Sequence, residues 1–285
     1  MKKTYFKKKR HEAVFSSIRV IGIVLGVSVV LLPFIFLFLN SIKPEFEFLS
    51  IPPRLLPSRI VTKYYRSLLS PESETLSFLY NSLIVTSATT ILAVLAGALA
   101  GYSLSHLRLS SKVISIAIFS IILIRFYPKI STLIPYFILV QKLHLLDTLI
   151  PVIIAHVSVT LPFVVLLMMS FFRDIPSSVE ESAKLEGCNV WQVFFRIAFP
   201  LSIPGLATSA ILTAIISWNE FLITSSLVSM NAQTLPIAVS SFVTHRGVHW
   251  GPMSATTVLI VAPVLLFTLL LQKYLVRGIT LGAIK

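Results

Sequence analysis

The sequence is poor in acidic residues and in cysteine, and it lacks the common catalytic motifs. Of its 285 residues only 11 are Asp or Glu, against 24 Lys and Arg, and Cys188 is the single cysteine. One cysteine excludes an intrachain disulfide. A phosphate-binding loop of the type G-x-x-x-x-G-K-[ST], an H-E-x-x-H pair and a serine nucleophile elbow are all missing from the sequence. The sequence therefore predicts neither nucleotide hydrolysis by this chain nor a membrane-embedded enzyme.

Metal and nucleic-acid sites are also disfavoured. Of six scattered histidines only His245 and His249 share a four-residue spacing, and neither has an acidic residue or a cysteine beside it. The net charge of +13 comes from basic residues dispersed at the ends of apolar segments, not from a soluble basic domain. We expect no metal, no cofactor and no nucleic-acid partner, and we expect these basic residues to contact membrane lipid.

Long apolar runs dominate what is present. Hydrophobic residues make up 55% of the chain and charged residues 12%, which is typical of a membrane protein. A hydrocarbon core about 30 Å thick requires roughly 20 apolar residues in a helix. The sequence predicts an all-α polytopic membrane protein with six transmembrane helices. These spans are residues 18–39, 80–104, 113–139, 149–172, 203–223 and 255–276. The basic tail, residues 1–17, resembles the start of a signal peptide, but the apolar run after it is too long, so we predict a retained helix.

The third run is the least regular. It is interrupted by Arg125, Tyr127, Pro128, Lys129 and Pro135. Backbone groups freed by proline must be satisfied inside the protein at this depth, so we predict a kinked helix that faces neighbouring helices or a cavity. Alternatively, the two cations extend to the outer membrane surface.

The distribution of basic residues predicts the orientation. The side that holds the N-terminus carries twice as many Lys and Arg residues as the other side, so we expect both termini and Cys188 in the cytoplasm. The outer loop 40–79 is predicted to be ordered, with a short helix near 63–69. The outer loop 224–254 is long enough to suggest a function.

Two glycine pairs at four-residue spacing predict close helix packing. Gly22 and Gly26 lie in the first span, and Gly97 and Gly101 lie in the second. Small residues at this spacing let two helices approach closely.

The inner loop between the fourth and fifth spans has the pattern of two short helices, residues 177–200. A capping box that starts at Ser177 or Ser178 is predicted to open the first helix. Gly187 ends it, because glycine adopts the left-handed conformation without steric cost. Asn189 is predicted to cap the second helix, which Pro200 and Pro204 stop or bend. On pattern alone this segment could also be an amphipathic connector on the membrane surface.

The same segment resembles the EAA motif, E-A-A-x-x-x-G-x9-I-x-L-P, of permease subunits in ABC importers. The matching positions are Glu181, Ala183, Gly187, Ile197 and Pro200. Ser182 stands in place of the second-position Ala and Phe199 in place of Leu, both mild departures. Other segments, among them "LPFVVLLMMSFFRDIPSSVEESA" and "YLVRGITLGAIK", are similar to the second permease subunit of maltose-type carbohydrate importers.

This resemblance implies a function and a set of partners. A permease of this type pairs with a sister permease subunit in a heterodimer, receives a sugar from an extracytoplasmic binding protein and is driven by a cytosolic ATPase dimer. The implied location is the cell inner membrane. The ATPase-coupling residues carried over from the motif are Glu180, Glu181, Ala183, Gly187 and Cys188. The resemblance also implies contact of Asn231–His249 with the binding protein, and of the tail from Gly278 to Lys285 with the ATPase interface.

Trp218, Asn219 and Glu220 form a second candidate site, because Glu220 is the only carboxylate within a predicted span. Such a carboxylate must face protein, water or the headgroup boundary. A pathway or gating role and a structural role both stay open. The alternatives to a sugar are glycerol phosphate or a polyol, and the alternative mechanism is an ion-coupled secondary transporter.

Overall fold

The computed structural model describes residues 2–107, 109–245 and 247–281, and most of them are helical. The chain divides into two compact units. The smaller unit contains residues up to 68 together with 242–258, and the larger contains 69–241 and the residues from 259 onward. The C-terminal helix α13 contributes residues to both.

The smaller unit is organised by its outer loop. Its elements are α1 (Lys2–Ser41), the 3-10 turn η1 (Glu45–Glu47), α2 (Lys63–Leu68), the antiparallel strands β1 (Val243–Thr244) and β2 (Gly247–Val248), and the first turns of α13 (Trp250–Leu281). Buried Glu47 accepts a hydrogen bond from the Ser58 backbone N–H at 3.2 Å, and the Lys43 ammonium donates to the Arg54 carbonyl at 2.7 Å. Side chains thus order this loop, and α2 confirms the predicted short helix.

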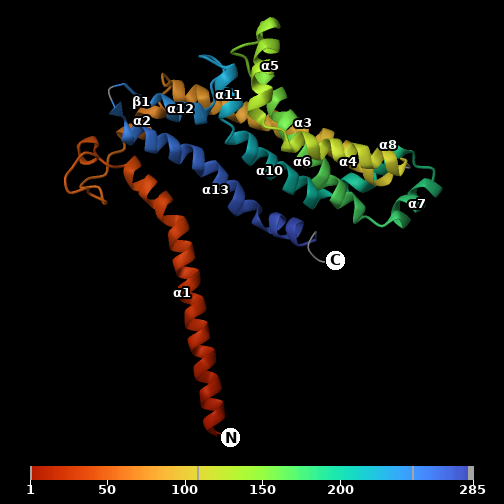
Figure 1. Cartoon of the computed structure of the whole chain (residues 1–285), viewed down its shortest axis with the longest axis horizontal. Helices are drawn as coiled ribbons and strands as arrows, with labels where there is room; N and C mark the ends of the chain where they lie inside the picture. The colour runs from red at the N-terminus through yellow and green to blue at the C-terminus, as the bar shows by residue number, and fades with distance from the viewer. Residues whose placement is uncertain (1, 108, 246, 282–285) are drawn as a thin grey trace. The chain divides into compact units, whose positions relative to one another are not determined.

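The larger unit is a helical bundle. Its elements are α3 (Glu74–His106), α4 (Ser111–Phe126), α5 (Lys129–Lys142), α6 (Leu149–Arg173), α7 (Ser177–Leu185), α8 (Val190–Val193), the π-helix η2 (Phe194–Ala198), α9 (Phe199–Leu201), α10 (Ile203–Trp218), α11 (Leu222–Leu227) and α12 (Leu235–Ser241). In Figure 1, α3, α6 and α10 run together, and α7 and α8 lie at one end of them. This end of the bundle carries the predicted inner loop.

Glycine allows α3 and α6 to pack closely. A Cβ on Gly97 would lie 2.5 Å from Cγ1 of Val164, and one on Gly101 would lie 2.8 Å from the backbone nitrogen of Met169. Distances this short are absent from real Cβ contacts, so only glycine fits. The predicted packing role is confirmed for this pair. By contrast, a Cβ on Gly22 or Gly26 would meet no described atom within 4 Å.

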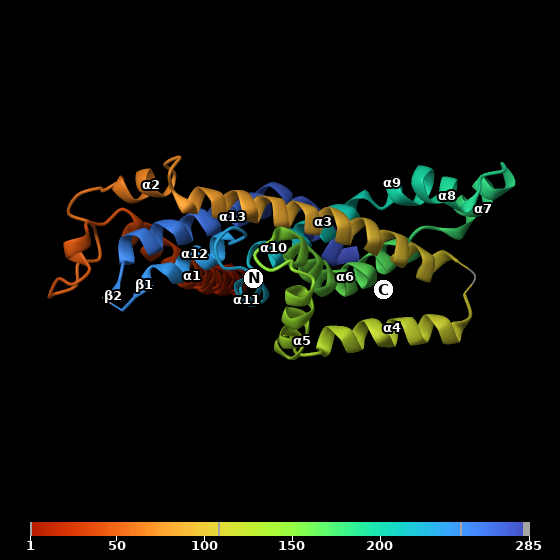
Figure 2. The ribbon, with the colours of Figure 1, turned by 90° about the horizontal axis from the view of Figure 1, so that it is seen from above.

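The third predicted span is broken into two helices. The described residues contain four helices that are long and apolar enough to cross a membrane, or up to six if each of two bent helix pairs is one span. The third run becomes α4 and α5, which meet at 90° between Phe126 and Lys129 (Figure 2). The predicted kink is therefore a complete break, because Pro128 provides no N–H to continue the ladder.

The fifth run is shorter than predicted. α10 ends at Trp218, and a separate helix, α11, starts at Leu222. The carboxylate of Glu220 accepts the backbone N–H groups of Ile223 and Thr224 and so caps the new helix. At the other end, α10 meets the preceding helical segment at 75°, which confirms the predicted bend near Pro200 and Pro204.

Candidate functional site

A glycine corner joins two short helices at one end of the bundle. Gly187 has a φ of +89°, the left-handed conformation that its position predicts. Its N–H donates to the Lys184 carbonyl at 3.1 Å, and the N–H of Cys188 donates to the Ala183 carbonyl at 3.0 Å. Two of the orphan carbonyls at the end of α7 are therefore satisfied within the corner.

The two helices begin differently. At α8 the Asn189 side chain accepts from the Gln192 N–H, and the Gln192 side chain accepts from the Asn189 N–H, which confirms the second predicted cap as a full capping box. At α7 the N-cap is Pro176 and no side chain caps the helix, so the first predicted capping box is wrong. The reason is that the helix already begins at Ser177, so Ser177 and Ser178 lie in its first turn and not at the N-cap.

Glu180 fastens α7 to the end of α3. Its side chain is buried, with one carboxylate oxygen 3.5 Å from Nε2 of His106 and the other 3.6 Å from Nζ of Lys184. The Tyr102 hydroxyl also interacts with this carboxylate. Ala183, one turn away on the same face, is buried as well. These two predicted site residues therefore face the bundle.

An aromatic cluster continues this attachment to α6 and the π-helix. The ring of Tyr102 stacks on His106 at 5.2 Å between centroids, lies edge-on to Phe172 at 5.4 Å and tilts against Phe194 at 5.1 Å. Phe172 and Phe194 are almost fully buried. The glycine corner is thus connected to three helices through packed side chains, the kind of contact that transmits displacement.

The opposite side of the corner is apolar and exposed. Leu185 is 90% exposed, Trp191 63% and Phe195 55%. We call these three residues the exposed apolar edge. Of the other predicted site residues, Glu181 and Gly187 are exposed beside this edge and Cys188 is half-buried. The five predicted coupling residues are therefore close in space but divided between an inner and an outer face.

The second candidate site separates into unrelated contacts. The buried Trp218 donates its Nε1 hydrogen to the Ile260 carbonyl of α13 at 3.0 Å. Asn219 is exposed and donates to Ile215 in its own helix. Glu220 caps α11 and lies 3.5 Å from Nε2 of His156. Capping and packing account for these contacts, which favours the structural interpretation for Glu220.

His156 is a functional candidate that the sequence interpretation missed. Its ring nitrogens lie 2.8 Å from Oγ of Ser217 and 3.0 Å from Oγ1 of Thr224. Together with Glu220 they form a buried polar cluster that joins α6, α10 and α11. An ionisable residue within a predicted span was the available signal.

Asp147 is a second residue whose role the sequence does not predict. It has a φ of +59°, and its carboxylate accepts the backbone N–H groups of Ser229, Met230, Asn231 and Ala232 at 2.9–3.2 Å. Burial raises the pKa of Asp147, but the four backbone donors outweigh burial and leave this pKa well below its usual value. Asp147 therefore holds the loop after α11 to the turn before α6.

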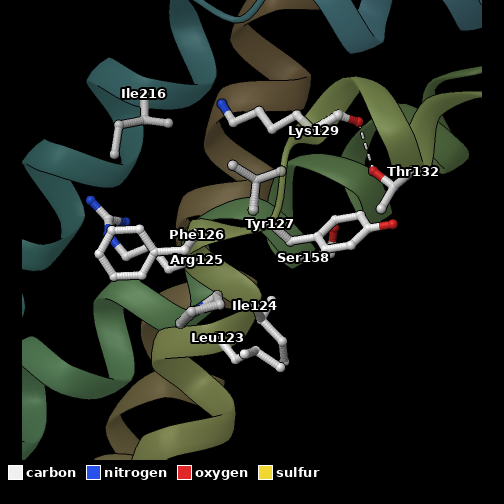
Figure 3. A pocket seen from close by; sticks show the side chains of 11 residues that line it. Leu123, Ile124, Arg125, Phe126, Tyr127, Lys129, Thr132, Ser158 and Ile216 are labelled. Carbon is white, nitrogen blue, oxygen red and sulfur yellow. Dashed lines mark hydrogen bonds between the residues drawn. The ribbon is translucent and has the colours of Figure 1, made fainter.

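A cavity of about 700 Å³ lies at the break between α4 and α5. Its lining includes Arg125, Tyr127 and Lys129 from the break, Ser158 from α6 and Ile216 from α10 (Figure 3). The broken run thus lines a cavity, as the sequence predicts for a helix interrupted by proline.

Metal ligation finds no support among the residues described. They contain no group of three or more His, Cys, Asp or Glu side chains placed to hold a metal ion. In the smaller unit, Nδ1 of His249 is 3.5 Å from a carboxylate oxygen of Glu45.

A bundle of long apolar helices with a glycine-cornered helix pair at one end is the fold of a helical membrane protein. Residues 93–281 match the family described as "Binding-protein-dependent transport system inner membrane component". The chain therefore belongs to this family of ABC importer permeases and is a transport subunit, not an enzyme.

Individual relatives agree over nearly the full length. The chain is 33% identical over 264 residues to the trehalose transport system permease protein SugB of Mycobacterium tuberculosis, covering 92% of this chain and 94% of the relative. It is 30% identical over 281 residues to the trehalose/maltose transport system permease protein MalG of Thermococcus litoralis, covering 97% and 99%.

The fold is found in a solved transporter. A chain from the crystal structure of a bacterial ABC transporter involved in import of the acidic polysaccharide alginate superimposes with a TM-score of 0.78. The match covers 93% of this chain and 98% of the other at 22% sequence identity, so it establishes the fold. The all-α, polytopic fold class is confirmed.

Proposed function

We propose that this chain is the second permease subunit of a heterodimeric importer that moves a sugar into the cytoplasm. Its partners are a sister permease, a cytosolic ATPase dimer and an extracytoplasmic sugar-binding protein. The names of two relatives, which refer to trehalose and maltose transport, support a sugar as the substrate class. Glycerol phosphate or a polyol stays an alternative within the same family.

The observation that carries this proposal is the exposed apolar edge of the glycine corner. Large apolar and aromatic residues on a protruding corner are typical of residues that fill a pocket on a partner protein. We assign the ATPase as this partner. Glu181 and Gly187 lie on the same side, whereas Glu180 and Ala183 hold the corner to the bundle.

Two sets of contacts would then couple the ATPase to the membrane helices. Movement of the docked corner displaces Glu180 with its partner His106, and Phe194 with its neighbours Tyr102 and Phe172. His106 and Tyr102 belong to α3 and Phe172 belongs to α6, and these two helices pack on one another through Gly97 and Gly101. ATP-driven closure of the ATPase thus biases a two-state element in the membrane.

The orientation in this proposal places both termini and the corner in the cytoplasm. The Lys and Arg distribution supports it. Asn231–His249 then lie on the outer side, where we propose contact with the binding protein. For the proposed C-terminal contact with the ATPase interface, α13 reaches Leu281, and residues 282–285 lie outside the described residues.

Substitution of the exposed apolar edge tests the ATPase contact. We expect Leu185→Asp to weaken co-purification of the ATPase by at least about tenfold, because a charge replaces an apolar anchor. Glu181→Lys reverses a charge on the same face, and Gly187→Val strains a residue at φ +89°; both should also reduce sugar uptake. The measurement is affinity capture of the ATPase from detergent-solubilised membranes, with uptake in proteoliposomes.

Leu49→Asp is the matched control, because Leu49 is 84% exposed in the loop predicted to lie outside. It should leave ATPase capture unchanged. Normal capture and uptake by Leu185→Asp, Glu181→Lys and Gly187→Val together would contradict the proposed coupling role.

A further inference from the structure

The cavity at the α4–α5 break has the size and composition of a small-molecule site. Its volume of about 700 Å³ falls within the range of roughly 300–1,000 Å³ that ligand pockets occupy. Apolar side chains, including Leu123, Val159 and Ile216, supply most of the lining, with a few polar groups among them. That combination is usual where a ligand is oriented by a small number of hydrogen bonds.

The cavity lies at membrane depth. Ser158 and Pro162, which line it, are in the middle third of α6, a helix of 25 residues. A helix of this length spans the hydrocarbon core, so its middle third lies in the interior of the bilayer. Backbone that departs from a helix is tolerated at such depth where it lines a cavity. The break at Tyr127 and Pro128 meets this condition.

Two cations point into this cavity without a carboxylate partner. Figure 3 shows Arg125 and Lys129 extending from the break toward the side on which Ile216 lies. Across the described part of the chain, neither forms an ion pair. The Arg125 guanidinium lies 5.2 Å from the centre of the Phe163 ring, which orients it without neutralising its charge. Unpaired cations at this depth are costly, so a functional site is their default interpretation, and substrate pathways are among the sites that they mark.

The remaining polar groups suit a carbohydrate. The hydroxyl groups of Thr132 and Ser158 donate to backbone carbonyls of their own helices, at 2.8 and 2.7 Å. Their oxygen lone pairs therefore stay available to accept hydrogen bonds from sugar hydroxyl groups. Phe126 and Tyr127 offer aromatic surface for the apolar face of a sugar ring.

We propose that this cavity is a substrate site that binds the anionic group of a charged carbohydrate, one that carries a carboxylate, sulfonate or phosphate. Arg125 and Lys129 bind the anionic group, and Thr132 and Ser158 accept from the sugar hydroxyl groups. The proposal rests on the function proposed above and specifies its substrate class. A neutral sugar would leave both cations unpaired in the membrane, whereas a charged one neutralises them.

The test uses the complete transporter, this chain with its sister permease and ATPase, in nanodiscs of phosphatidylcholine. Two pairs of probes differ in charge: maltose against maltobionate, and trehalose against trehalose 6-phosphate. Binding is titrated by saturation-transfer difference NMR. We expect Arg125→Gln and Lys129→Gln each to weaken binding of the anionic probes by at least about tenfold, with binding of the neutral probes unchanged.

Lys112→Gln and Lys142→Gln are matched controls, because they remove cations from the same two helices, α4 and α5, but outside the cavity lining. They should leave binding of every probe unchanged. The proposal is overturned if the wild-type complex binds neither anionic probe, or if Arg125→Gln and Lys129→Gln retain wild-type binding. An equal loss for neutral and anionic probes would also overturn it.

Two further measurements distinguish substrate binding from lipid binding, and this inference from the proposed function. If the Gln variants lower thermal stability only in phosphatidylglycerol nanodiscs and leave probe binding intact, the cations bind lipid headgroups, and the substrate assignment is wrong. If the wild-type complex imports a neutral sugar in an ATP-dependent manner but imports neither anionic probe, this inference fails while the proposed function stands. Failure of the chain to assemble with the ATPase would instead overturn the proposed function.

Discussion

Individual carboxylates fix parts of this chain that apolar packing leaves undefined. Glu180 fastens α7 through His106, and Glu220 starts α11 beside His156. The Asp147 carboxylate accepts hydrogen bonds from four consecutive backbone N–H groups. In a chain with only 11 acidic residues, three of them thus hold turns or short helices in place.

Replacement of Asp147 should free the loop that follows α11. In Asp147→Ala the amide hydrogens of residues 229–232 lose their shared acceptor, and hydrogen bonds to a charged group contribute about 1.5–3 kcal/mol. We therefore expect these amides to exchange at least about tenfold faster in hydrogen-exchange mass spectrometry. Because the folded pKa is lowered, this contribution is present at neutral pH and is lost only as the pH falls below the usual range of Asp.

Asp174→Ala serves as the control, because Asp174 follows α6 at its other end and is exposed. It should leave exchange at residues 229–232 as in the wild type. Unchanged exchange in Asp147→Ala would show that the loop is held by other contacts.

The sequence could not reveal these roles residue by residue. The left-handed corner at Gly187 and the capping box at Asn189 were predictable, because they depend on neighbours within a few positions. Asp147 and residues 229–232 are far apart in the chain, so no local pattern relates them. The same holds for Glu180 and His106, which are in contact although they are far apart in the chain.

At the scale of the elements, two glycines four residues apart allow close helix packing in α3 but meet no described neighbour in α1. Gly97 and Gly101 let α3 approach α6 closely, whereas Gly22 and Gly26 on α1 meet no described atom within 4 Å. A small-residue spacing indicates that a helix can be approached closely, and the sequence does not say by which partner.

Gly101→Leu should therefore destabilise the bundle. The new side chain would collide with the backbone of α6 at Met169, and overpacking typically costs about 1–3 kcal/mol. We expect a lower unfolding temperature for the purified chain in detergent, with poorer membrane expression. Gly22→Leu places the same side chain in a membrane helix without a described neighbour, so it should unfold like the wild type. Equal unfolding temperatures for both variants would contradict the packing role of Gly101.

The sequence predicts where a helix is interrupted, but it does not predict the angle between the two helices that result. Proline and charged residues marked the third run, yet a kink and a 90° break have the same sequence signature. The fifth run shows the opposite case, since its hydropathy continues through Glu220 while its helix stops at Trp218. The capping contacts of Glu220 decide this boundary, and hydropathy does not register them.

For the whole molecule, the orientation in the membrane connects the glycine corner to its proposed partner. The corner can meet a cytosolic ATPase only if it lies on the cytoplasmic side. The Lys and Arg bias supports that side for the inner loop and for both termini. The outer loop held by Asp147 then faces the binding protein, so the two proposed partner surfaces lie on opposite sides of the membrane.

Cys188 allows this orientation to be measured without a prior substitution, because it is the only cysteine and is half-buried at the glycine corner. We expect a membrane-impermeant maleimide to label Cys188 in inside-out vesicles but not in intact spheroplasts. The variant Cys188→Ser/Met230→Cys moves the thiol to a site that is 78% exposed in the outer loop, and its labelling should reverse. Labelling of Cys188 from outside would place the corner away from the ATPase, and the coupling proposal would then fail together with the orientation.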